Sequence, residues 1–202
     1  MTHRARMKMC SSLRAGAVWF LALIGGALAA CSPPAFKSVD ITGAAYARDF
    51  SLEAAGGGHR SLGDFRGKVV VVFFGFTQCP DVCPTTLADL AEVKKRLGAD
   101  GARLQVIFIT IDPERDTPAL LSQYVPAFDP SFVGLYGSAE QTAATAKEFK
   151  VFYQKVPGKT ATSYTMDHTA GAYVFDKEGR IRLFMRHGTS VDDIAADLRR
   201  LL

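Results

Sequence analysis

The chain has 202 residues, of which 48% are hydrophobic and 22% are charged, so it is long enough for one domain with an apolar core. The formal net charge of +4 comes from residues 1–30, which contain Arg4, Arg6, Lys8 and Arg14 and no acidic side chain. The rest of the chain is electrically balanced. Because nucleic-acid binding requires a basic face on the folded domain, we expect no nucleic-acid partner.

Residues 1–30 have the pattern of an export signal. After the basic start, an apolar stretch runs from Ala17 to Ala30. It is shorter than the about 20 residues of a membrane-spanning helix and suits the hydrophobic part of a signal peptide. Its end, LAAC at residues 28–31, resembles the bacterial lipobox. This resemblance implies cleavage before Cys31 and attachment of lipid to that cysteine. The alternatives are an uncleaved anchor, or a signal followed by an incidental cysteine.

Residues 31–47 are predicted to be a flexible, lipid-anchored linker, because Ser32-Pro33-Pro34 and the residues after it show no hydrophobic periodicity. Two or three acyl chains hold a protein stably at a bilayer, whereas a single chain does not. We therefore expect residues 48–202 to form a domain anchored to a membrane of the bacterial cell envelope and facing the periplasm.

A strand and a helix are predicted on either side of Cys79 and Cys83. The run of β-branched and aromatic residues at 69–74 is typical of a central strand buried on both faces. A helix is predicted to begin at residue 84 or 85 and to end before Gly98. The two cysteines then lie in the loop at the N-terminus of this helix, where unpaired N–H groups and the helix dipole favour thiolates.

The rest of the chain continues an α/β pattern. Strands are predicted at residues 104–111 and 132–135, and a helix at 138–149 with a capping box of Ser138 and Gln141. Residues 172–175 and 181–186 are predicted to form a β-hairpin, and a last helix to begin at Ser190. This is the element order of a thioredoxin-like α/β fold, with residues 50–66 as an extra N-terminal β-hairpin.

Cys79 and Cys83 are the cysteines that remain if Cys10 leaves with the signal and Cys31 carries lipid. Four positions apart in an exported protein, they can form a disulfide, bind a metal or cycle between these states. A purely structural disulfide is a weak alternative, because closing so short a loop removes little chain entropy. Thioredoxins place two residues between their cysteines, whereas the three found here give each sulfur more freedom to reach a shared ion.

His168 is the predicted third member of the site. Thioredoxins carry a cis-proline just before the hairpin strand, facing the cysteines, and this chain has His168 in the corresponding segment. Two thiolates and one imidazole suit copper, because sulfur favours Cu(I) and imidazole extends the range to Cu(II). Zinc also accepts such a set, although structural zinc sites usually have four protein ligands. His59, in a glycine-rich turn, and His187, after the hairpin, are weaker candidates.

Three blocks of sequence together resemble the SCO/SenC (PrrC) family of copper proteins. They are residues 74–87 (FGFTQCPDVCPTTL), residues 110–118 (TIDPERDTP) and the pair Asp167-His168. The resemblance runs from about residue 49 to the C-terminus and implies that Cys79, Cys83 and His168 bind copper, as Cu(I) and Cu(II). Gln78 departs from the pattern, since many members carry histidine there.

The second of these blocks contains the charge-rich segment 112–116 (DPERD). It could form a docking surface or simply a loop that precedes a helix cap at Thr117. We favour the loop and cap, because a threonine hydroxyl commonly accepts a hydrogen bond from the first turn of a helix.

The family resemblance implies a copper metallochaperone that delivers copper to the dinuclear copper site (CuA) in subunit II of cytochrome c oxidase. Another periplasmic copper chaperone is a candidate second partner. The first alternative is an enzyme, a thiol-disulfide oxidoreductase that reduces the CuA cysteines through Cys79 and Cys83, since a dithiol at a helix N-terminus also suits that chemistry. A copper or redox sensor is a further alternative. We expect binding and transfer rather than catalytic turnover.

Overall fold

The computed structural model describes residues 35–160 and 163–202. Residues Phe36–Leu202 form one folded unit. The predicted signal peptide, residues 1–30, and the predicted lipid-attachment residue Cys31 lie outside the described residues. Within the described part of the chain, no helix combines the length and the apolar character that crossing a membrane requires.

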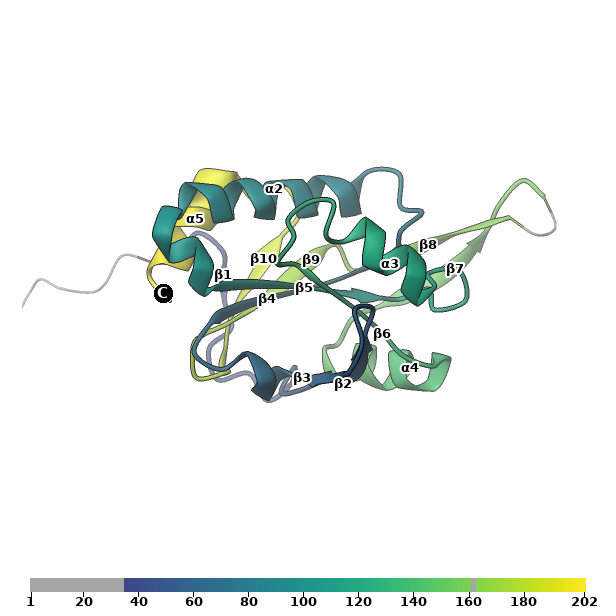
Figure 1. The fold of residues 1–202 in the computed structure, drawn as a ribbon, viewed down its shortest axis with the longest axis horizontal. Coiled ribbons are helices and arrows are strands. Elements are labelled where there is room, and N and C mark those ends of the chain that lie inside the picture. Colours follow the sequence, from purple (N-terminus) through teal and green to yellow (C-terminus); the bar gives the residue numbers. More distant parts are fainter. Residues whose placement is uncertain (1–34, 161–162) are drawn as a thin grey trace, which may run out of the picture. The chain divides into compact units, whose positions relative to one another are not determined.

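A mixed β-sheet runs through the centre of the folded unit (Figure 1). The parallel pairing of its central strands places their carboxyl ends at one edge of the sheet. Among the described residues its eight strands lie in the order β1 (Val39–Asp40), β10 (Ile181–Arg186), β9 (Gly171–Phe175), β4 (Val69–Gly75), β5 (Leu104–Thr110), β6 (Val133–Tyr136), β2 (Ser51–Ala54) and β3 (His59–Ser61). Strand β5 is parallel to both β4 and β6, whereas β9 is antiparallel to β4.

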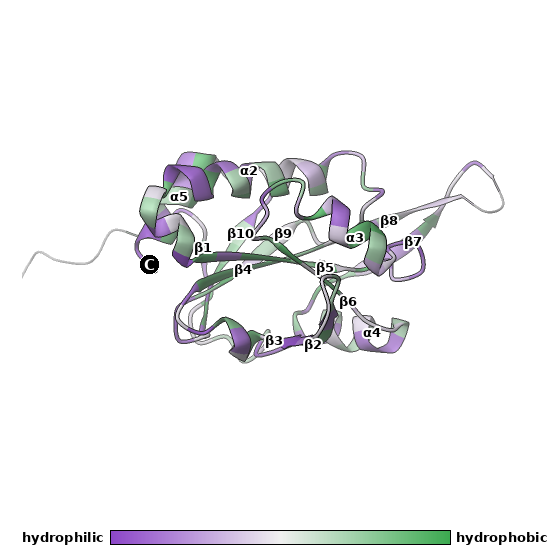
Figure 2. Cartoon of the chain, in the orientation of Figure 1, coloured by the Kyte–Doolittle hydropathy of each residue, from purple (hydrophilic) through white to green (hydrophobic). Residues whose placement is uncertain are grey.

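Helices cover both faces of the sheet (Figure 1). Helices α2 (Val82–Arg96), α3 (Pro118–Tyr124) and α5 (Val191–Arg199) lie on one face, and α4 (Ala139–Glu148) lies on the other. Two 3-10 helices, η1 (Leu62–Phe65) and η2 (Gly98–Arg103), belong to the connections. Hydrophobic residues concentrate in the central strands (Figure 2). The α/β, thioredoxin-like prediction is therefore confirmed, and the extra N-terminal hairpin is β2–β3, which extends the sheet beyond β6.

Strand β4 is buried along its whole length, as its composition predicts. Successive side chains of a strand point to opposite faces. Phe73 packs against Phe108 with ring centroids 6.0 Å apart, whereas Phe74 packs against Phe149 on the other face at 5.1 Å. Each fully buried phenylalanine contributes about 1.5–3 kcal/mol relative to an exposed one. The end of β4, from which the cysteine loop leaves, is therefore held firmly by the core.

Helix α2 begins at Val82, before the predicted start, with Asp81 at its N-cap position. Cys83 therefore lies in the first helical turn rather than in the loop, whereas Cys79 is in the loop as predicted. Most other predicted elements are present with ends shifted by one or two residues, but the hairpin predicted at residues 50–66 ends at Ser61, and residues 62–65 form the 3-10 helix η1. The Ser138–Gln141 capping box is formed, and Ser190 caps α5.

The predicted linker, residues 31–47, is wrong in its C-terminal part. Strand β1 pairs with β10, and the backbone N–H groups of Lys37 and Ser38 donate to the carboxylate of Asp197 at 2.9 and 2.7 Å. Ala47 is fully buried. The domain therefore starts earlier than residue 48. The sequence pattern misses this because distant residues, rather than local periodicity, hold the segment in place.

A second sheet, which the sequence pattern does not predict, consists of β7 (Tyr153–Pro157) and β8 (Tyr164–His168). The two strands are antiparallel and form a ribbon that extends away from the main sheet (Figure 1). Its side chains are mostly exposed or half-buried, so its hydrophobic signal is weak. His168 is the last residue of β8.

Candidate metal centre

Cys79 lies in the loop that joins β4 to α2. Its backbone N–H donates to the carbonyl of Phe76 at 3.2 Å, which closes a tight turn. The side chain of Phe76 is buried in the core beneath this turn. Cys79 is half-buried as a residue and Cys83 is fully buried, so Cys79 is the more accessible of the two.

Cys83 is buried, and its backbone N–H donates to Sγ of Cys79 at 3.4 Å. The N-terminus of α2 thus supplies a hydrogen bond to one sulfur, as expected. For Cys83 itself the prediction of a favoured thiolate is wrong: burial raises the pKa of its thiol, and a hydrogen bond with Cys79 adds to the shift. Cys83 therefore keeps its proton at neutral pH until a metal displaces it.

His168 reaches the cysteines from the base of the ribbon. Its Nε2 lies 3.7 Å from Sγ of Cys83, and its Nδ1 lies 3.1 Å from the carbonyl oxygen of Thr169. Because a carbonyl only accepts hydrogen bonds, Nδ1 carries the proton and the lone pair of Nε2 points to the cysteines. Phe73 and Phe76 pack edge-on against the imidazole, with centroids 6.2 and 6.0 Å away. Burial lowers the pKa of His168, which keeps the ring neutral and able to bind a metal.

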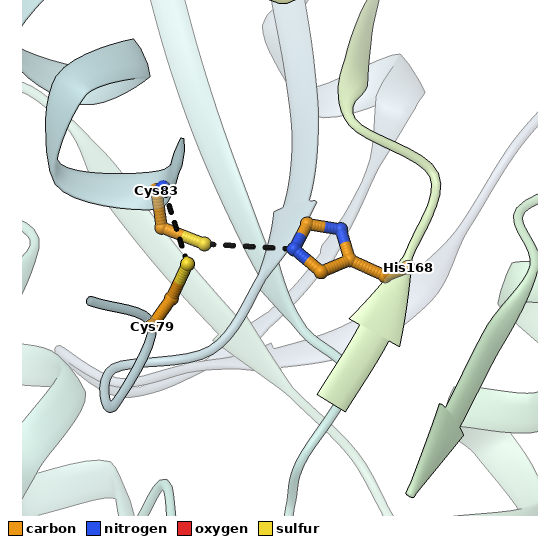
Figure 3. Close-up of side chains that lie close together, drawn as sticks. All are labelled: Cys79, Cys83 and His168. Atoms are coloured by element: carbon orange, nitrogen blue, oxygen red, sulfur yellow. Dashed lines mark hydrogen bonds between the residues drawn. The ribbon is translucent and has the colours of Figure 1, made fainter. Parts of the chain in front are cut away.

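The structure brings the three predicted site residues together, although 85 positions separate Cys83 from His168 (Figure 3). One ligand atom from each of Cys79, Cys83 and His168 lies within 4.8 Å of the others. Around a three-coordinate ion with metal–sulfur bonds of about 2.3 Å and metal–nitrogen bonds of about 2.0 Å, such atoms are about 3.7–4.0 Å apart. The donor set therefore fits one metal ion with only small side-chain movements.

A buried acidic pair, Asp112 and Asp116, lies beside the cysteine loop, although the sequence pattern favours only a loop and a helix cap in this segment. Thr117 caps α3 as predicted, since the N–H of Leu120 donates to its Oγ1 at 3.2 Å. Asp112 and Asp116, however, are each only 1% exposed. Asp116 accepts hydrogen bonds from Thr77, which precedes Cys79 by two residues. Burial raises the pKa of Asp116, and the hydrogen bonds from threonines oppose that shift.

The order of the strands gives a sequence signal that Asp112 and Asp116 lie near the cysteines. Strand β4 leads to the cysteine loop, and β5 leads to residues 112–116. The two strands are parallel neighbours, with Gly75 opposite Thr110. Segments that follow the carboxyl ends of neighbouring parallel strands meet at the same edge of the sheet.

The two weaker histidine candidates lie elsewhere. Nε2 of His59 contacts Oγ of Ser51 at 2.8 Å, on the edge hairpin β2–β3. Nδ1 of His187 contacts Oγ1 of Thr86 at 3.3 Å, and its side chain is exposed. Neither belongs to the cysteine–histidine group.

The sequence model of the SCO1/SenC family matches residues 39–202, which includes the whole site. The chain belongs to the SCO1/SenC family. The family resemblance found in the sequence is thus confirmed. In this SCO1/SenC protein the three resembling blocks meet at one end of the sheet: the first carries both cysteines, the second carries Asp112 and Asp116, and the third carries His168.

Relatives of this SCO1/SenC protein include mitochondrial and bacterial members. It is 39% identical over 154 residues to the mitochondrial SCO2 homologue of Bos taurus, in an alignment that covers 75% of this chain and 58% of that relative. The chain therefore spans less than two thirds of that relative's length.

Solved structures have a similar fold, among them two that are at least 40% identical to this chain. A copper-bound ScoI from Bradyrhizobium japonicum is 40% identical, with a TM-score of 0.70 over 76% of this chain and 98% of that chain. The apo Sco1 protein of Thermus thermophilus is 42% identical, with a TM-score of 0.75 over 85% of this chain and all of that chain (100%).

Proposed function

We propose that this SCO1/SenC protein is a copper metallochaperone that binds Cu(I) and Cu(II) through Cys79, Cys83 and His168. It then delivers the copper to the CuA site in subunit II of cytochrome c oxidase. The observation that carries the proposal is the convergence of two sulfurs and one imidazole nitrogen within 4.8 Å. A similar ScoI from Bradyrhizobium japonicum has been solved with copper bound, which supports the choice of metal.

The chemistry of the three donors supports transfer rather than permanent storage. Thiolates hold Cu(I), and the imidazole improves the binding of Cu(II). Cys79 is partly exposed, so a thiolate of the acceptor can approach the copper while Cys83 still holds it. Because Cys83 is protonated in the metal-free protein, copper binding releases a proton and weakens as the pH falls.

Copper transfer to a purified CuA domain tests the proposal directly. We expect the copper-loaded protein to pass copper to that domain, and the variant with both Cys79→Ser and Cys83→Ser to bind and pass none. His168→Ala is expected to weaken Cu(II) binding far more than Cu(I) binding. His187→Ala is the matched control, because this exposed histidine lies outside the cluster. An intact Cu(II) affinity in His168→Ala would remove the histidine from the ligand set.

A thiol-disulfide oxidoreductase is the second candidate, favoured by the hydrogen bond from the Cys83 N–H to Sγ of Cys79. The partly exposed Cys79 attacks a disulfide between the CuA cysteines, and Cys83 then displaces the partner. Cys79 and Cys83 are thereby oxidised to a disulfide while the CuA cysteines are reduced to two thiols. Incubation of the reduced protein with an oxidised, metal-free CuA domain tests this, with free thiols on each protein as the readout. No gain of thiols on the CuA domain dismisses the reductase.

We also propose that the protein is anchored by lipid on Cys31 and faces the periplasm. The lipobox-like residues 28–31 support this proposal. The proposed partner also supports it, because the chain must be exported in order to reach the CuA site. Mass spectrometry of the mature N-terminus is the test. An N-terminal cysteine carrying acyl chains is expected, and an intact Met1 in the mature protein contradicts the proposal.

A further inference from the structure

The three residues of the metal centre lie at the ends of two different β-sheets, which residues 169–170 join. Cys79 and Cys83 follow β4, whose residues are all buried in the core. His168 ends the ribbon β7–β8, which forms a sheet of its own. The ribbon must be held close to the cysteine loop, because a displacement of His168 would take the imidazole out of bonding reach of the two sulfurs.

Arg115 contacts both parts at once. It lies between β5 and α3, and its Nη1 donates to Oε1 of Gln78 at 3.0 Å and to the carbonyl oxygen of Tyr164 at 2.8 Å. Gln78 immediately precedes Cys79, and Tyr164 is four residues before His168 on β8. The guanidinium also stacks over the ring of Tyr164, 3.6 Å from its centroid.

Asp112 fixes the position of Arg115. Its carboxylate, 1% exposed, accepts a hydrogen bond from Nε of Arg115 at 2.5 Å and another from the hydroxyl of Tyr164 at 2.8 Å. The side chain of Arg115 is itself 20% exposed. A planar guanidinium that is paired on one edge and stacked on one face has little freedom to move. The group Gln78, Asp112, Arg115 and Tyr164, here termed the Arg115 latch, thus links the cysteine loop to the ribbon.

We propose that Arg115 is a positioning residue that holds the His168 ribbon against the cysteine loop and so keeps the copper ligands assembled. This inference rests on the proposed function. The latch should therefore affect the two oxidation states of copper differently, because its opening moves the imidazole and leaves the two sulfurs in place. Cu(II), which needs the imidazole, is then bound more weakly, whereas Cu(I) stays with the thiolates.

The test replaces the charged pair with the neutral variant Asp112→Asn/Arg115→Met, so that no buried carboxylate is left without its partner. The control is Asp176→Asn/Arg180→Met, which removes another pair of a buried aspartate and an arginine, outside the latch and at the far end of β9. Cu(II) and Cu(I) affinities of the full chain are measured by chelator competition. Amide hydrogen exchange of β8 is measured in the metal-free protein.

We expect the latch variant to bind Cu(II) about 10- to 100-fold more weakly, the range typical when a group that orients a metal ligand is lost. Cu(I) affinity should be unchanged, and β8 amides should exchange faster. In the background of His168→Ala the same variant should cause no further loss of Cu(II) affinity, because both changes act on one ligand. Arg115→Lys keeps the positive charge but lacks the planar, forked guanidinium, so it should bind Cu(II) almost as weakly as the latch variant. Tyr164→Leu removes the stacked ring and its hydroxyl, so it should also weaken Cu(II) binding. This variant tests the latch independently if the double variant does not fold.

The inference is overturned if the latch variant leaves both the Cu(II) affinity and the amide exchange of β8 unchanged. It is also overturned if the control variant loses as much Cu(II) affinity, or if the latch variant lowers Cu(II) affinity by the same factor in the His168→Ala background. The proposed function fails for different reasons: the wild type binds no copper, or His168→Ala keeps the full Cu(II) affinity. The hydrogen-exchange arm reports on the latch whether or not copper binds.

Discussion

Asp116 accepts hydrogen bonds from both the backbone N–H and the hydroxyl of Thr77, at 3.0 and 2.6 Å. A third hydrogen bond comes from the hydroxyl of Thr110 at 2.6 Å. The carboxylate is buried and thus ties the cysteine loop to the end of β5. Cys79 follows two residues after Thr77, so the geometry of its sulfur depends on a side chain 37 positions further along the chain than Cys79 itself.

Asp116→Ala should therefore loosen the cysteine loop. The change leaves the Thr77 N–H and two hydroxyls without their acceptor, and each buried unpaired group costs about 1–3 kcal/mol. Relief of the cost of burying a carboxylate offsets part of this, so we expect a net loss of about 1–3 kcal/mol in urea unfolding. Asp192→Ala, which removes an exposed partner of Arg96, is the control and should change little. An unchanged urea midpoint in Asp116→Ala would show that the loop does not depend on this carboxylate.

Gly75→Ala should disturb the metal centre although it replaces none of the three ligands. A Cβ at this position would lie 2.8 Å from Sγ of Cys83 and 2.8 Å from the ring of Phe108, so one of them must move. Overpacking of this kind typically costs about 1–3 kcal/mol. We expect lower thermal stability and weaker Cu(I) binding, measured by scanning calorimetry and chelator competition. Gly56→Ala is the control, because its Cβ meets nothing within 4 Å. Equal behaviour of the two variants would contradict the close approach.

Acid should weaken the turn between β9 and β10 through Asp176. Burial alone would raise the pKa of Asp176, but hydrogen bonds from the backbone and side chain of Arg180, and from Arg182, outweigh it and lower that pKa. A lowered carboxyl pKa adds stability above the unfolded value, and this stability is lost as the pH falls through the folded value.

Asp176→Asn should therefore be less stable than the wild type at neutral pH, and the difference should shrink as the pH falls below about 4. Urea unfolding at a series of pH values measures this. Asp100→Asn, an exposed carboxylate paired with Arg103, is the control. A difference between Asp176→Asn and wild type that stays constant down to pH 2 is inconsistent with the assigned direction of the pKa shift.

Asp197→Ala should release the first strand from the sheet. The carboxylate of Asp197 is buried and accepts the backbone N–H groups of Lys37 and Ser38. A hydrogen bond to a charged group contributes about 1.5–3 kcal/mol. We expect faster amide hydrogen exchange in β1 and its partner β10, with copper affinity unchanged because the metal centre involves neither strand. Retained protection of the β1 amides would show that strand pairing alone holds this segment.

Local patterns in the sequence determine much of the fold. The buried strand β4 is visible as an unbroken β-branched and aromatic run, because a strand covered on both faces needs apolar side chains at every position. The helix starts at Ser138 and Ser190 are visible because a capping hydroxyl acts within three residues of itself. The three residues of the candidate metal centre are also predictable, since the residue types and the family blocks both point to them.

The tertiary structure alone decides how these residues are held. The docking of β1 through Asp197 and the bracing of Thr77 by Asp116 join residues far apart in the chain, whereas the ribbon β7–β8 is a local hairpin that is mostly exposed or half-buried. Their side chains are polar or half-buried, so they leave no periodicity to read. The raised pKa of Cys83 likewise comes from burial by surrounding elements, which opposes the helix N-terminus that the local sequence suggests. Neighbouring residues determine helix caps and hydrophobic patterns, so the sequence predicts them. Desolvation and long-range contacts arise only once the chain has folded.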